Sequence, residues 1–390
     1  MLILHTAFGY PPLVSGIPQT LCMISERLAA RGHEVHVATG AVPGSPATEV
    51  RNGVTVHRFD VRGNLVHGIS GDTQGYIEFV RSTVWDVVAS HCAQVWSTDL
   101  LFNVHLTAPV IFVAHGLSYT DPAYRTYFKQ LAEWLGHEKC MVSISSVGID
   151  DAAFRKDYSL PDAVIIPIGV DTKEWNAPPL GVREVWGKEA EPWLVNVSNH
   201  TPPKGHNRLF ELMKQLRSRK RKMHLTQIGR SHFAARWNLG RLGVRGGCYY
   251  SCRARALLDQ SMSLVLSLPR EETVSAVKEA DLMVLTSNWE ASPAVILECM
   301  AAGVPFVTFD VGCVREHVGG RVVASLPEMA DTIIELMADA ELRRDLGEQG
   351  KRRIAERHDW DVVVDAYERL YGKLTSERKR PGLTPVAKTW

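Results

Sequence analysis

The sequence predicts an α/β protein with two doubly wound domains, each built around a parallel sheet. Apolar strand-like runs alternate with stretches of helical periodicity along the chain, which is typical of parallel strands joined by helices. The alternation occurs in two rounds, and 390 residues suit two domains. Between the rounds, residues 169–191 are rich in Pro, Gly and charge, as expected of a hinge. Two such sheets facing each other would form a cleft.

The first round begins at the N-terminus, where residues 1–8 read as a strand and a helix follows. In that helix, apolar residues recur at helical spacing from Ile17 to Leu28, and Gly32 ends it. Residues 122–139 are amphipathic and would line a binding site or pack on the sheet. We expect further strands at 33–40, 94–98, 109–116, 141–146 and 163–169.

The second round begins with the strand-like residues 192–199 and ends in a long helical tail. Residues 340–371 read as two helices with a break near Trp360. The last residues are basic and are expected to fray. We expect further strands at 223–229, 262–267, 281–287, 303–310 and 319–325, and helices at 207–219 and 271–280.

Composition excludes several classes of protein. Lys+Arg 44 against Asp+Glu 43 gives a net charge of +1, so no global field calls for nucleic acid as a partner. No apolar run approaches the ~20 residues of a membrane span, and the chain starts directly in a strand-like run. Seven scattered cysteines suit reduced thiols, so a cytoplasmic location is expected. Cys248 and Cys252 form a C-x3-C pair, but no second pair or flanking His completes a zinc site, so we expect no metal.

The stretch "SNWEASPAVILECMAAGVPFVTF", residues 287–309, contains a helix start that favours an anion. Ser is a favoured N-cap and Pro is favoured at the first helical position, so we expect the helix to begin at Ser292 and Pro293. The amides of Ala294 and Val295 would then point back toward the preceding loop. That end of a helix attracts negative charge.

Two carboxylates flank this helix start. Glu290 lies in the loop before it, and Glu298 lies on the second turn. A strand at 281–287 precedes the loop, and ligands of open parallel sheets bind where a strand leads into a helix in this way. Taken alone, each acid could also be a solvated surface residue.

Two other positions could supply contacts to an anion. Lys204 lies between a predicted strand and a predicted helix, where its ammonium group could bind phosphate. Gly16 precedes a helix with Pro18 in its first turn, and a glycine there lets the backbone approach a ligand closely. A solvated lysine and a plain turn glycine are the alternatives.

Several motifs together resemble those of a known family, the retaining nucleotide-sugar glycosyltransferases of family four, which have the GT-B fold. The resemblance runs almost end to end. In chain order, the motifs are "GHEVHVAT", "VAHGLS", "PIGVDTKEW", "PPKGH", "EASPAVILECMAAGVPFV" and "AELRRDLGEQGKRRIAERHDW".

The resemblance implies how the chain is divided into domains. The N-terminal, acceptor-side domain would comprise residues 1–172 together with a C-terminal helix at 360–375 that crosses back to it. The nucleotide-sugar-binding domain would be 173–359, and a basic tail would follow at 376–390.

The resemblance also implies roles for single residues. Glu298 is similar to the family's acid that accepts hydrogen bonds from the ribose, and Glu290 to the acid beside the donor sugar. His115 resembles the histidine that faces the reaction centre, although a structural histidine at a strand end is the alternative. Lys204 and the amides at Pro293 would bind the diphosphate, with Gly16 close to the donor.

The chain departs from the family at two donor-binding positions. Asn199 stands where the family commonly has an arginine, so the second positive group could be Arg230, at the end of the next strand. The usual Gly-Gly of the first loop is Ser15-Gly16. Both departures bear on donor affinity or donor type.

The resemblance implies transfer of a sugar from a nucleotide diphosphate such as UDP or GDP to an acceptor hydroxyl, without metal or other cofactor. The leaving phosphate oxygen would take the acceptor's proton, and the protein would supply position and charge. The acceptor would be a small molecule, a glycan or a lipid-linked glycan. Basic stretches such as 217–224 could give weak peripheral membrane contact, although solvated charge is the simpler interpretation.

Other functions on the same fold stay open. One is a different GT-B enzyme, either an inverting transferase or a nucleotide-sugar epimerase. The other is a non-catalytic nucleotide-sugar-binding protein, which the departures at Asn199 and Ser15 make conceivable. A dinucleotide dehydrogenase is disfavoured because no G-x-G-x-x-G follows the first strand.

Overall fold

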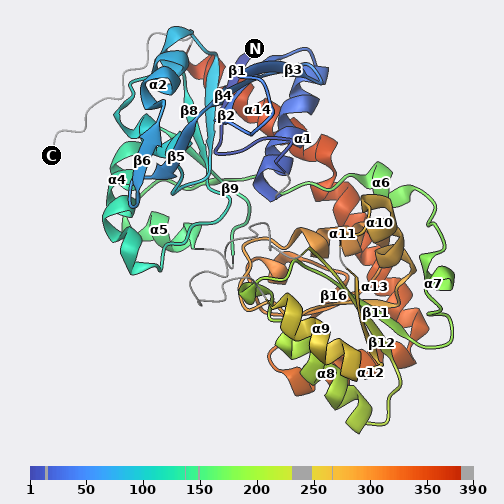
Figure 1. Cartoon of the computed structure of the whole chain (residues 1–390). Helices are drawn as coiled ribbons and strands as arrows, with labels where there is room; N and C mark the ends of the chain where they lie inside the picture. The colour runs from blue at the N-terminus through green and yellow to red at the C-terminus, as the bar shows by residue number, and fades with distance from the viewer. Residues whose placement is uncertain (14–15, 137, 148–149, 231–247, 266, 379–390) are drawn as a thin grey trace. The chain divides into compact units, whose positions relative to one another are not determined.

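The structure is a computed structural model and describes residues 1–13, 16–136, 138–147, 150–230, 248–265 and 267–378 (Figure 1). The chain forms two compact units, Met1–Ile168 with Trp360–Trp390, and Gly169–Asp359. Each unit holds a largely parallel sheet flanked by helices, which confirms the predicted fold class.

The first unit contains an eight-stranded sheet in the order β10-β9-β8-β7-β1-β2-β4-β3. Neighbouring strands are parallel except at one edge, where β3 pairs antiparallel with β4. Its strands are β1 Leu2–Thr6, β2 Glu34–Gly40, β3 Thr48–Arg51, β4 Val54–Phe59, β7 Val87–His91, β8 Val110–Val113, β9 Cys140–Ser143 and β10 Val164–Ile165. A separate antiparallel hairpin joins β5 Val61–Asn64 to β6 Gly68–Gly71.

Helices cover both faces of this sheet, because alternate strand residues point to opposite sides. On one face, α1 (Gly16–Ala30) and α14 (Trp360–Arg378) pack on residues such as Ile3 and Val35. On the other face, residues such as Leu4 and Phe112 meet α2, α3, α4 and α5. These helices are α2 Thr73–Ser82, α3 Trp96–Asp99, α4 Arg125–Leu135 and α5 Asp151–Asp157, with 3-10 turns η1 Leu100–Asn103 and η2 Pro122–Tyr124.

The C-terminal helix α14 belongs to the first unit, although the whole of the second unit precedes it in the chain. Its apolar face is buried beside α1, as the red and blue ribbons in Figure 1 show. The Tyr371 hydroxyl lies 3.0 Å from Nε2 of His5 in β1. Before it, α13 (Ala340–Arg353) ends in a π-helical turn, η6 (Ile354–His358), so the predicted break near Trp360 is confirmed.

One expectation for the first unit is wrong, and one of two alternatives is decided. Residues 94–98 do not form a strand: α3 begins at Trp96, and its four residues are buried against the sheet. The strand is the preceding β7, whose five residues are all buried and therefore show no alternation of polar and apolar side chains. The amphipathic stretch 122–139 packs on the sheet, because the apolar face of α4 belongs to the core.

The second unit contains a six-stranded, fully parallel sheet in the order β13-β12-β11-β14-β15-β16. Its strands are β11 Trp193–Val197, β12 His224–Ile228, β13 Met262–Val265, β14 Leu282–Leu285, β15 Phe306–Phe309 and β16 Gly320–Val323. Its helices are α6 Thr172–Asn176, α7 Val182–Val185, α8 Asn207–Ser218, α9 Tyr249–Leu258, α10 Arg270–Glu279, α11 Ala294–Ala302, α12 Leu326–Ala338 and α13, with 3-10 turns η3 Pro202–Lys204 and η5 Val314–Glu316.

Close helix packing holds α11 in place. A Cβ atom at Gly347 of α13 would meet the carbonyl oxygen of Gly303, the residue that ends α11. At Gly350, one turn further, a Cβ would lie 3.1 Å from the Cα of Met300. The two glycines let the backbones of α13 and α11 approach, and α11 carries Glu298.

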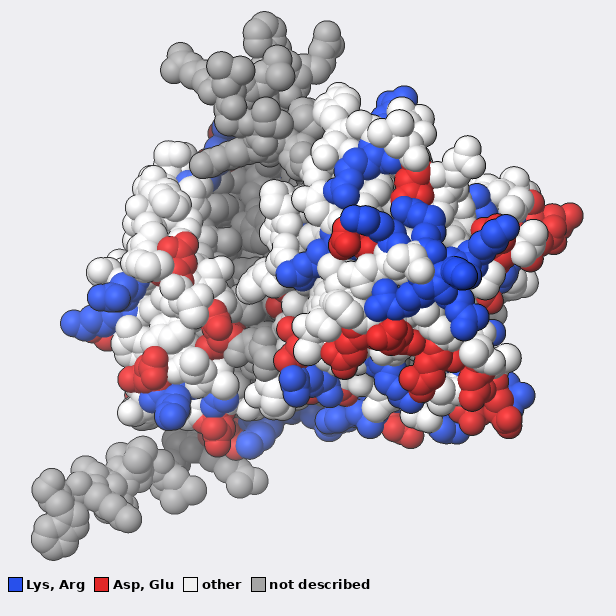
Figure 2. Space-filling view, turned by 90° about the horizontal axis from the view of Figure 1, so that it is seen from below, with Lys and Arg blue, Asp and Glu red and all other residues white. Residues whose placement is uncertain are grey.

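Basic side chains of the second unit lie among acidic ones. Figure 2 shows a face on which Lys and Arg gather beside a band of Asp and Glu. In the basic stretch 217–224, Arg217 donates to Asp259 at 2.7 Å and Arg219 to Asp331 at 3.0 Å. Membrane contact therefore stays a prediction. Among the described residues, none of the helices has the length and hydropathy needed to cross a bilayer.

Candidate active site

The loop between β14 and α11 ends in a helix start, one residue later than expected. Pro293 is the N-cap, and the first hydrogen bond of the helix runs from the Ile296 amide to the Pro293 carbonyl at 2.9 Å. Ser292 is therefore not the cap. Helix geometry gives the amides of Ala294 and Val295 no partner within the helix, so these two groups can bind a ligand.

Glu290 and Lys204 form an ion pair in front of this helix start. The Lys204 ammonium donates to both oxygens of Glu290, at 2.7 and 2.9 Å. The Ser287 hydroxyl donates to the same carboxylate at 2.6 Å. The Glu290 side chain is 10% exposed and that of Lys204 is 28% exposed, so both groups remain accessible.

The loop that carries Lys204 is fastened to the end of β14. The Asn288 amide donates to the Pro203 carbonyl at 2.6 Å, and the Thr286 hydroxyl donates to the Gly205 carbonyl at 3.3 Å. Gly205 has a φ of +62°, and a Cβ there would collide with the Thr286 carbonyl oxygen. These contacts fix the lysine loop beside the loop of Glu290.

The loop that carries Glu290 is supported from its other side by Gly312. The Cys313 amide donates to the Ala291 carbonyl at 3.0 Å. Gly312 has a φ of +54°, and a Cβ there would meet the carbonyl oxygens of Ala291 and Glu290. The backbone of Glu290 therefore depends on a glycine 22 positions later, a contact that no local sequence pattern predicts.

Glu298 is held by an arginine at the start of α10. Arg270 lies 2.7 Å from Glu298 and also makes two hydrogen bonds to Glu174, at 2.8 and 2.7 Å, while its guanidinium group lies over the Trp175 ring. Burial raises the pKa of Glu298 above its usual value, and Arg270 opposes that shift. Sequence reasoning did not single out Arg270, which lies far from Glu298 in the chain.

Asn199 and Arg230 lie at adjacent strand ends, as their places in the sequence suggested. The Arg230 amide donates to Oδ1 of Asn199 at 3.1 Å, and the His200 amide donates to the Arg230 carbonyl at 3.0 Å. The Asn199 side chain thus positions the Arg230 backbone, and both residues are exposed.

His115 lies in the first unit, just after β8, in a left-handed conformation with a φ of +56°. Its Nε2 lies 2.9 Å from Nδ1 of His91, the last residue of β7. Burial lowers the pKa of His115 to about 4, and it lowers that of His91 well below the ordinary value, so both rings are neutral near pH 7. His91 could not be singled out from the sequence, because it stands in β7, the strand that the sequence did not predict.

Gly16 is the first residue of α1, also in the first unit. A Cβ atom built there would meet no atom of the described residues within 4 Å, so their packing does not require a glycine. Ser15, where the chain departs from the family, lies outside the described residues.

The structure brings two histidines to the C-x3-C pair, contrary to the expectation that no His flanks it. His200, His206, Cys248 and Cys252 place their ligand atoms within 4.8 Å of one another. Sequence reasoning missed the two histidines because they lie more than 40 residues before the cysteines.

Comparison with known families covers most of the chain. The sequence profile described as Glycosyltransferase Family 4 matches residues 14–174, and the one described as Glycosyl transferases group 1 matches residues 182–353.

Curated relatives include glycosyltransferases and synthases. The N-acetyl-alpha-D-glucosaminyl L-malate synthase of Bacillus anthracis is 33% identical over 114 residues, or 27% of this chain and 30% of that enzyme. The glycogen synthase of Mycobacterium tuberculosis is 23% identical over 95% of this chain and 94% of its own. The alpha-D-kanosaminyltransferase of Streptomyces kanamyceticus is 25% identical over 90% of this chain and 97% of its own.

Solved structures share the fold. The sucrose-phosphate synthase of Thermosynechococcus elongatus superposes with a TM-score of 0.76 at 17% identity, covering 96% of this chain and 99% of that chain. Anabaena HepE, solved with UDP and glucose, has a TM-score of 0.70 at 15% identity and covers 95% of this chain and 99% of its own. The two similar structures and the two sequence profiles all indicate the same two-domain architecture. The chain belongs to the GT-B glycosyltransferases, with a first half of the family 4 type and a second half of the group 1 type.

Proposed function

We propose that the protein transfers a sugar from a nucleotide-diphosphate sugar to an acceptor hydroxyl with retention of anomeric configuration. The observation that carries the proposal is the Lys204–Glu290 pair in front of the α11 N-terminus. One cation, one anion and two helix amides there match the parts of a donor that must be bound together: a diphosphate and a sugar.

The diphosphate would bind to Lys204 and to the amides of Ala294 and Val295. A helix N-terminus favours an anion, and an ammonium group adds a full positive charge. Arg230, exposed at the end of β12, is the candidate for a second cation where Asn199 replaces the usual arginine. The UDP bound to the structurally similar HepE supports a nucleotide diphosphate as the ligand class.

The two carboxylates would bind the sugars on either side of the diphosphate. Glu298 would accept hydrogen bonds from the ribose hydroxyls, and Arg270 keeps that carboxylate oriented. Glu290 would contact the donor sugar and stabilise positive charge at its anomeric carbon. We assign to His115, whose ring is neutral, a contact with the reacting sugar groups.

The chemistry would need no metal ion. The acceptor oxygen forms a bond to the anomeric carbon while the bond from that carbon to the β-phosphate oxygen breaks. The acceptor's proton passes to the leaving phosphate oxygen on the same face of the sugar. Lys204 and the helix amides offset the charge that develops on the phosphate. Two relatives whose names specify α-linked sugars, the malate synthase and the kanosaminyltransferase, support retention.

A screen in two stages tests the proposal. First, nucleoside diphosphates and their sugars are tested for a rise in melting temperature, which reports binding by mass action. The best donor is then incubated with candidate acceptors, and the anomeric configuration of the product is read by NMR. We expect a UDP- or GDP-linked α-sugar to give an α-linked product.

Variants separate catalysis from binding alone. Glu290→Gln should lose transfer, whereas Glu348→Gln, an exposed acid on α13, should keep it. An inverted product would identify an inverting enzyme, and a donor changed in the absence of acceptor would identify an epimerase. Nucleotide binding without turnover in the wild-type protein would indicate a non-catalytic binding protein.

A further inference from the structure

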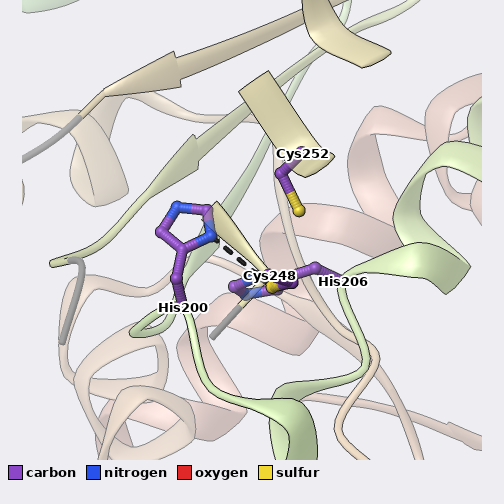
Figure 3. Close-up of side chains that lie close together, drawn as sticks. All are labelled: His200, His206, Cys248 and Cys252. Carbon is purple, nitrogen blue, oxygen red and sulfur yellow. Dashed lines mark hydrogen bonds between the residues drawn. The ribbon is translucent and has the colours of Figure 1, made fainter. Parts of the chain in front are cut away.

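A cluster of two imidazoles and two thiols lies in the second unit, beside the loop that carries Lys204. Figure 3 shows His200, His206 and Cys252 arranged around the Cys248 sulfur. His200, His206 and Cys252 are at most 2% exposed, and Cys248 is partly buried. A cavity of about 350 Å³, lined by His206, Cys248 and the lysine loop, gives access from solvent.

The four residues have the types and spacing of a structural zinc site. Such sites pair two cysteines separated by about two to four residues with two histidines separated by about three to five. Here five residues separate His200 from His206, and three separate Cys248 from Cys252. No carboxylate belongs to the cluster, so the hard cations Ca²⁺ and Mg²⁺, which prefer oxygen, are disfavoured.

The distances also suit one tetrahedral ion. Bonds of about 2.3 Å to sulfur and about 2.0 Å to nitrogen place tetrahedral ligand atoms about 3.3–3.8 Å apart. The Cys248 sulfur lies 3.0 Å from Nδ1 of His206 and 3.6 Å from Nδ1 of His200. All four ligand atoms lie within 4.8 Å of one another, so shifts of about 1 Å would complete the geometry.

A chain of hydrogen bonds fixes the His206 ring in the form that a metal requires. The Asn196 amide nitrogen donates to the Val284 carbonyl at 2.8 Å, so its Oδ1 is free to accept the Ser198 hydroxyl proton at 2.6 Å. Ser198 Oγ must then accept from Nε2–H of His206, 2.7 Å away. The Nδ1 lone pair is left facing Cys248. Metal-binding histidines are oriented by such a second hydrogen bond.

His200 adds an independent indication of a missing partner. Its ring is fully buried, and its Nε2 has no hydrogen-bond partner among the described residues. The other ring nitrogen, Nδ1, faces the cluster, and its hydrogen-bond contact among the described residues is with the Cys248 thiol 3.6 Å away. A buried Nδ1 with so long a contact is poorly satisfied without a ligand.

From these observations we propose that His200, His206, Cys248 and Cys252 bind one zinc ion in a closed, structural site. Zinc binds through two thiolates and two neutral imidazoles, and the two thiol protons pass to water. Four protein ligands leave no position for a reacting water, so this ion has no part in sugar transfer.

The site would fasten the lysine loop. His200 and His206 stand on either side of residues 201–205, and Cys248 is the N-cap of α9. One ion would therefore tie both ends of the loop that carries Lys204 to the start of a neighbouring helix. The proposal does not depend on which donor or acceptor the protein uses.

The first test measures metal in the wild-type full-length protein. The protein is purified without chelator from zinc-supplemented cells, and its zinc content is measured by mass spectrometry. We expect about one zinc per chain, and removal by a strong chelator should lower the melting temperature. Adding zinc should restore it. Refilling with cobalt should give the visible absorption of tetrahedral cobalt bound to thiolates.

Variants locate the ion. Cys248→Ser and His206→Gln should each lose most of the bound zinc and the effect of chelator on melting temperature. Cys140→Ser in the first unit and His224→Gln in β12 are matched controls that should keep both. If a cluster variant fails to fold, the wild-type zinc content and cobalt spectrum still decide.

Three results would overturn the proposal. Wild-type protein with no stoichiometric metal and seven titratable thiols would show that the cluster is only hydrogen-bonded. Metal-free protein with two thiols fewer, restored by reductant, would show a Cys248–Cys252 disulfide instead. Zinc retained by both cluster variants would place the ion elsewhere.

Discussion

The Lys204 ammonium lies 2.7 and 2.9 Å from the two carboxylate oxygens of Glu290. In this ion pair each group neutralises the other. A diphosphate that binds Lys204 would compete for that ammonium and leave Glu290 with Ser287, ready to face a positively charged sugar centre. The pair thus links two events, phosphate binding and exposure of the carboxylate.

Lys204→Ala should remove a positive charge from the leaving group with little effect on the fold. We expect kcat/KM to fall by about 10²–10³-fold, as when one charge-stabilising donor is lost. The melting temperature should fall only slightly, because Glu290 keeps the hydrogen bond from Ser287 when the ion pair is lost. Steady-state kinetics measure kcat/KM, and a thermal unfolding curve measures the melting temperature.

Lys214→Ala is the control for that variant, since Lys214 lies exposed on α8 of the same unit. It should keep wild-type kinetics. Wild-type turnover in Lys204→Ala would show that the diphosphate does not meet this lysine.

Gly16→Ala tests whether a ligand approaches the backbone at the start of α1. No atom of the described part of the chain lies within 4 Å of the added methyl group, so the fold should tolerate it and gain about 0.4–1 kcal/mol from a less flexible unfolded chain. If the donor binds against the backbone of Gly16, the rate of transfer should fall at least tenfold while the melting temperature stays the same or rises. Unchanged transfer would remove Gly16 from the donor site.

Much of the fold could be predicted from the sequence because it depends on local patterns. Apolar runs such as 281–287 and 303–310 marked strands, and the break near Trp360 separated two helices. Prediction failed where burial removed the pattern: β7 is buried on both faces, and the short helix α3 resembles a strand.

The candidate site could also be predicted only in part. Glu290, Lys204 and the α11 N-terminus could be predicted because each stands at a strand-to-helix junction. The groups that position them could not, because they are remote in sequence from the residues that they hold: Gly312 supports Glu290, and Arg270 holds Glu298 on α11. Such contacts follow only from the order of strands in the sheet.

Gly312→Ala tests the support of the Glu290 loop. A side chain at a φ of +54° costs about 1–2 kcal/mol in backbone strain, and the methyl group also collides with the carbonyls of Ala291 and Glu290. We expect lower thermal stability and a loss of transfer, because the carboxylate moves with its backbone.

Gly187→Ala separates strain from collision. Gly187 has a φ of +61° in the same unit, but an added Cβ meets none of the residues that the structure describes within 4 Å. It should lose a similar amount of stability through backbone strain and keep its transfer activity. Equal activity of the two variants would show that the Gly312 contact does not position Glu290.

The buried histidines of the first unit should make its stability depend on pH. Burial lowers the pKa of His5 to about 3 and that of His115 to about 4, and it lowers the pKa of His91 as well. In the unfolded chain these histidines have pKa values near 6.5 and become protonated below that pH, whereas in the folded protein their rings stay neutral to lower pH. The contribution of these histidines to the free energy of unfolding is therefore fully present above about pH 6.5. It falls as pH decreases, by about 1.4 kcal/mol per pH unit for each histidine.

His91→Phe removes one of these rings and keeps an aromatic side chain in the space between His5 and His115. Between pH 7.5 and pH 5, the melting temperature of the variant should fall less than that of the wild-type protein, because one proton fewer favours the unfolded state. His67→Phe, at an exposed position, should follow the wild-type curve. Parallel curves for wild type and His91→Phe would mean that His91 is protonated in the folded protein, which would contradict a neutral His91–His115 pair.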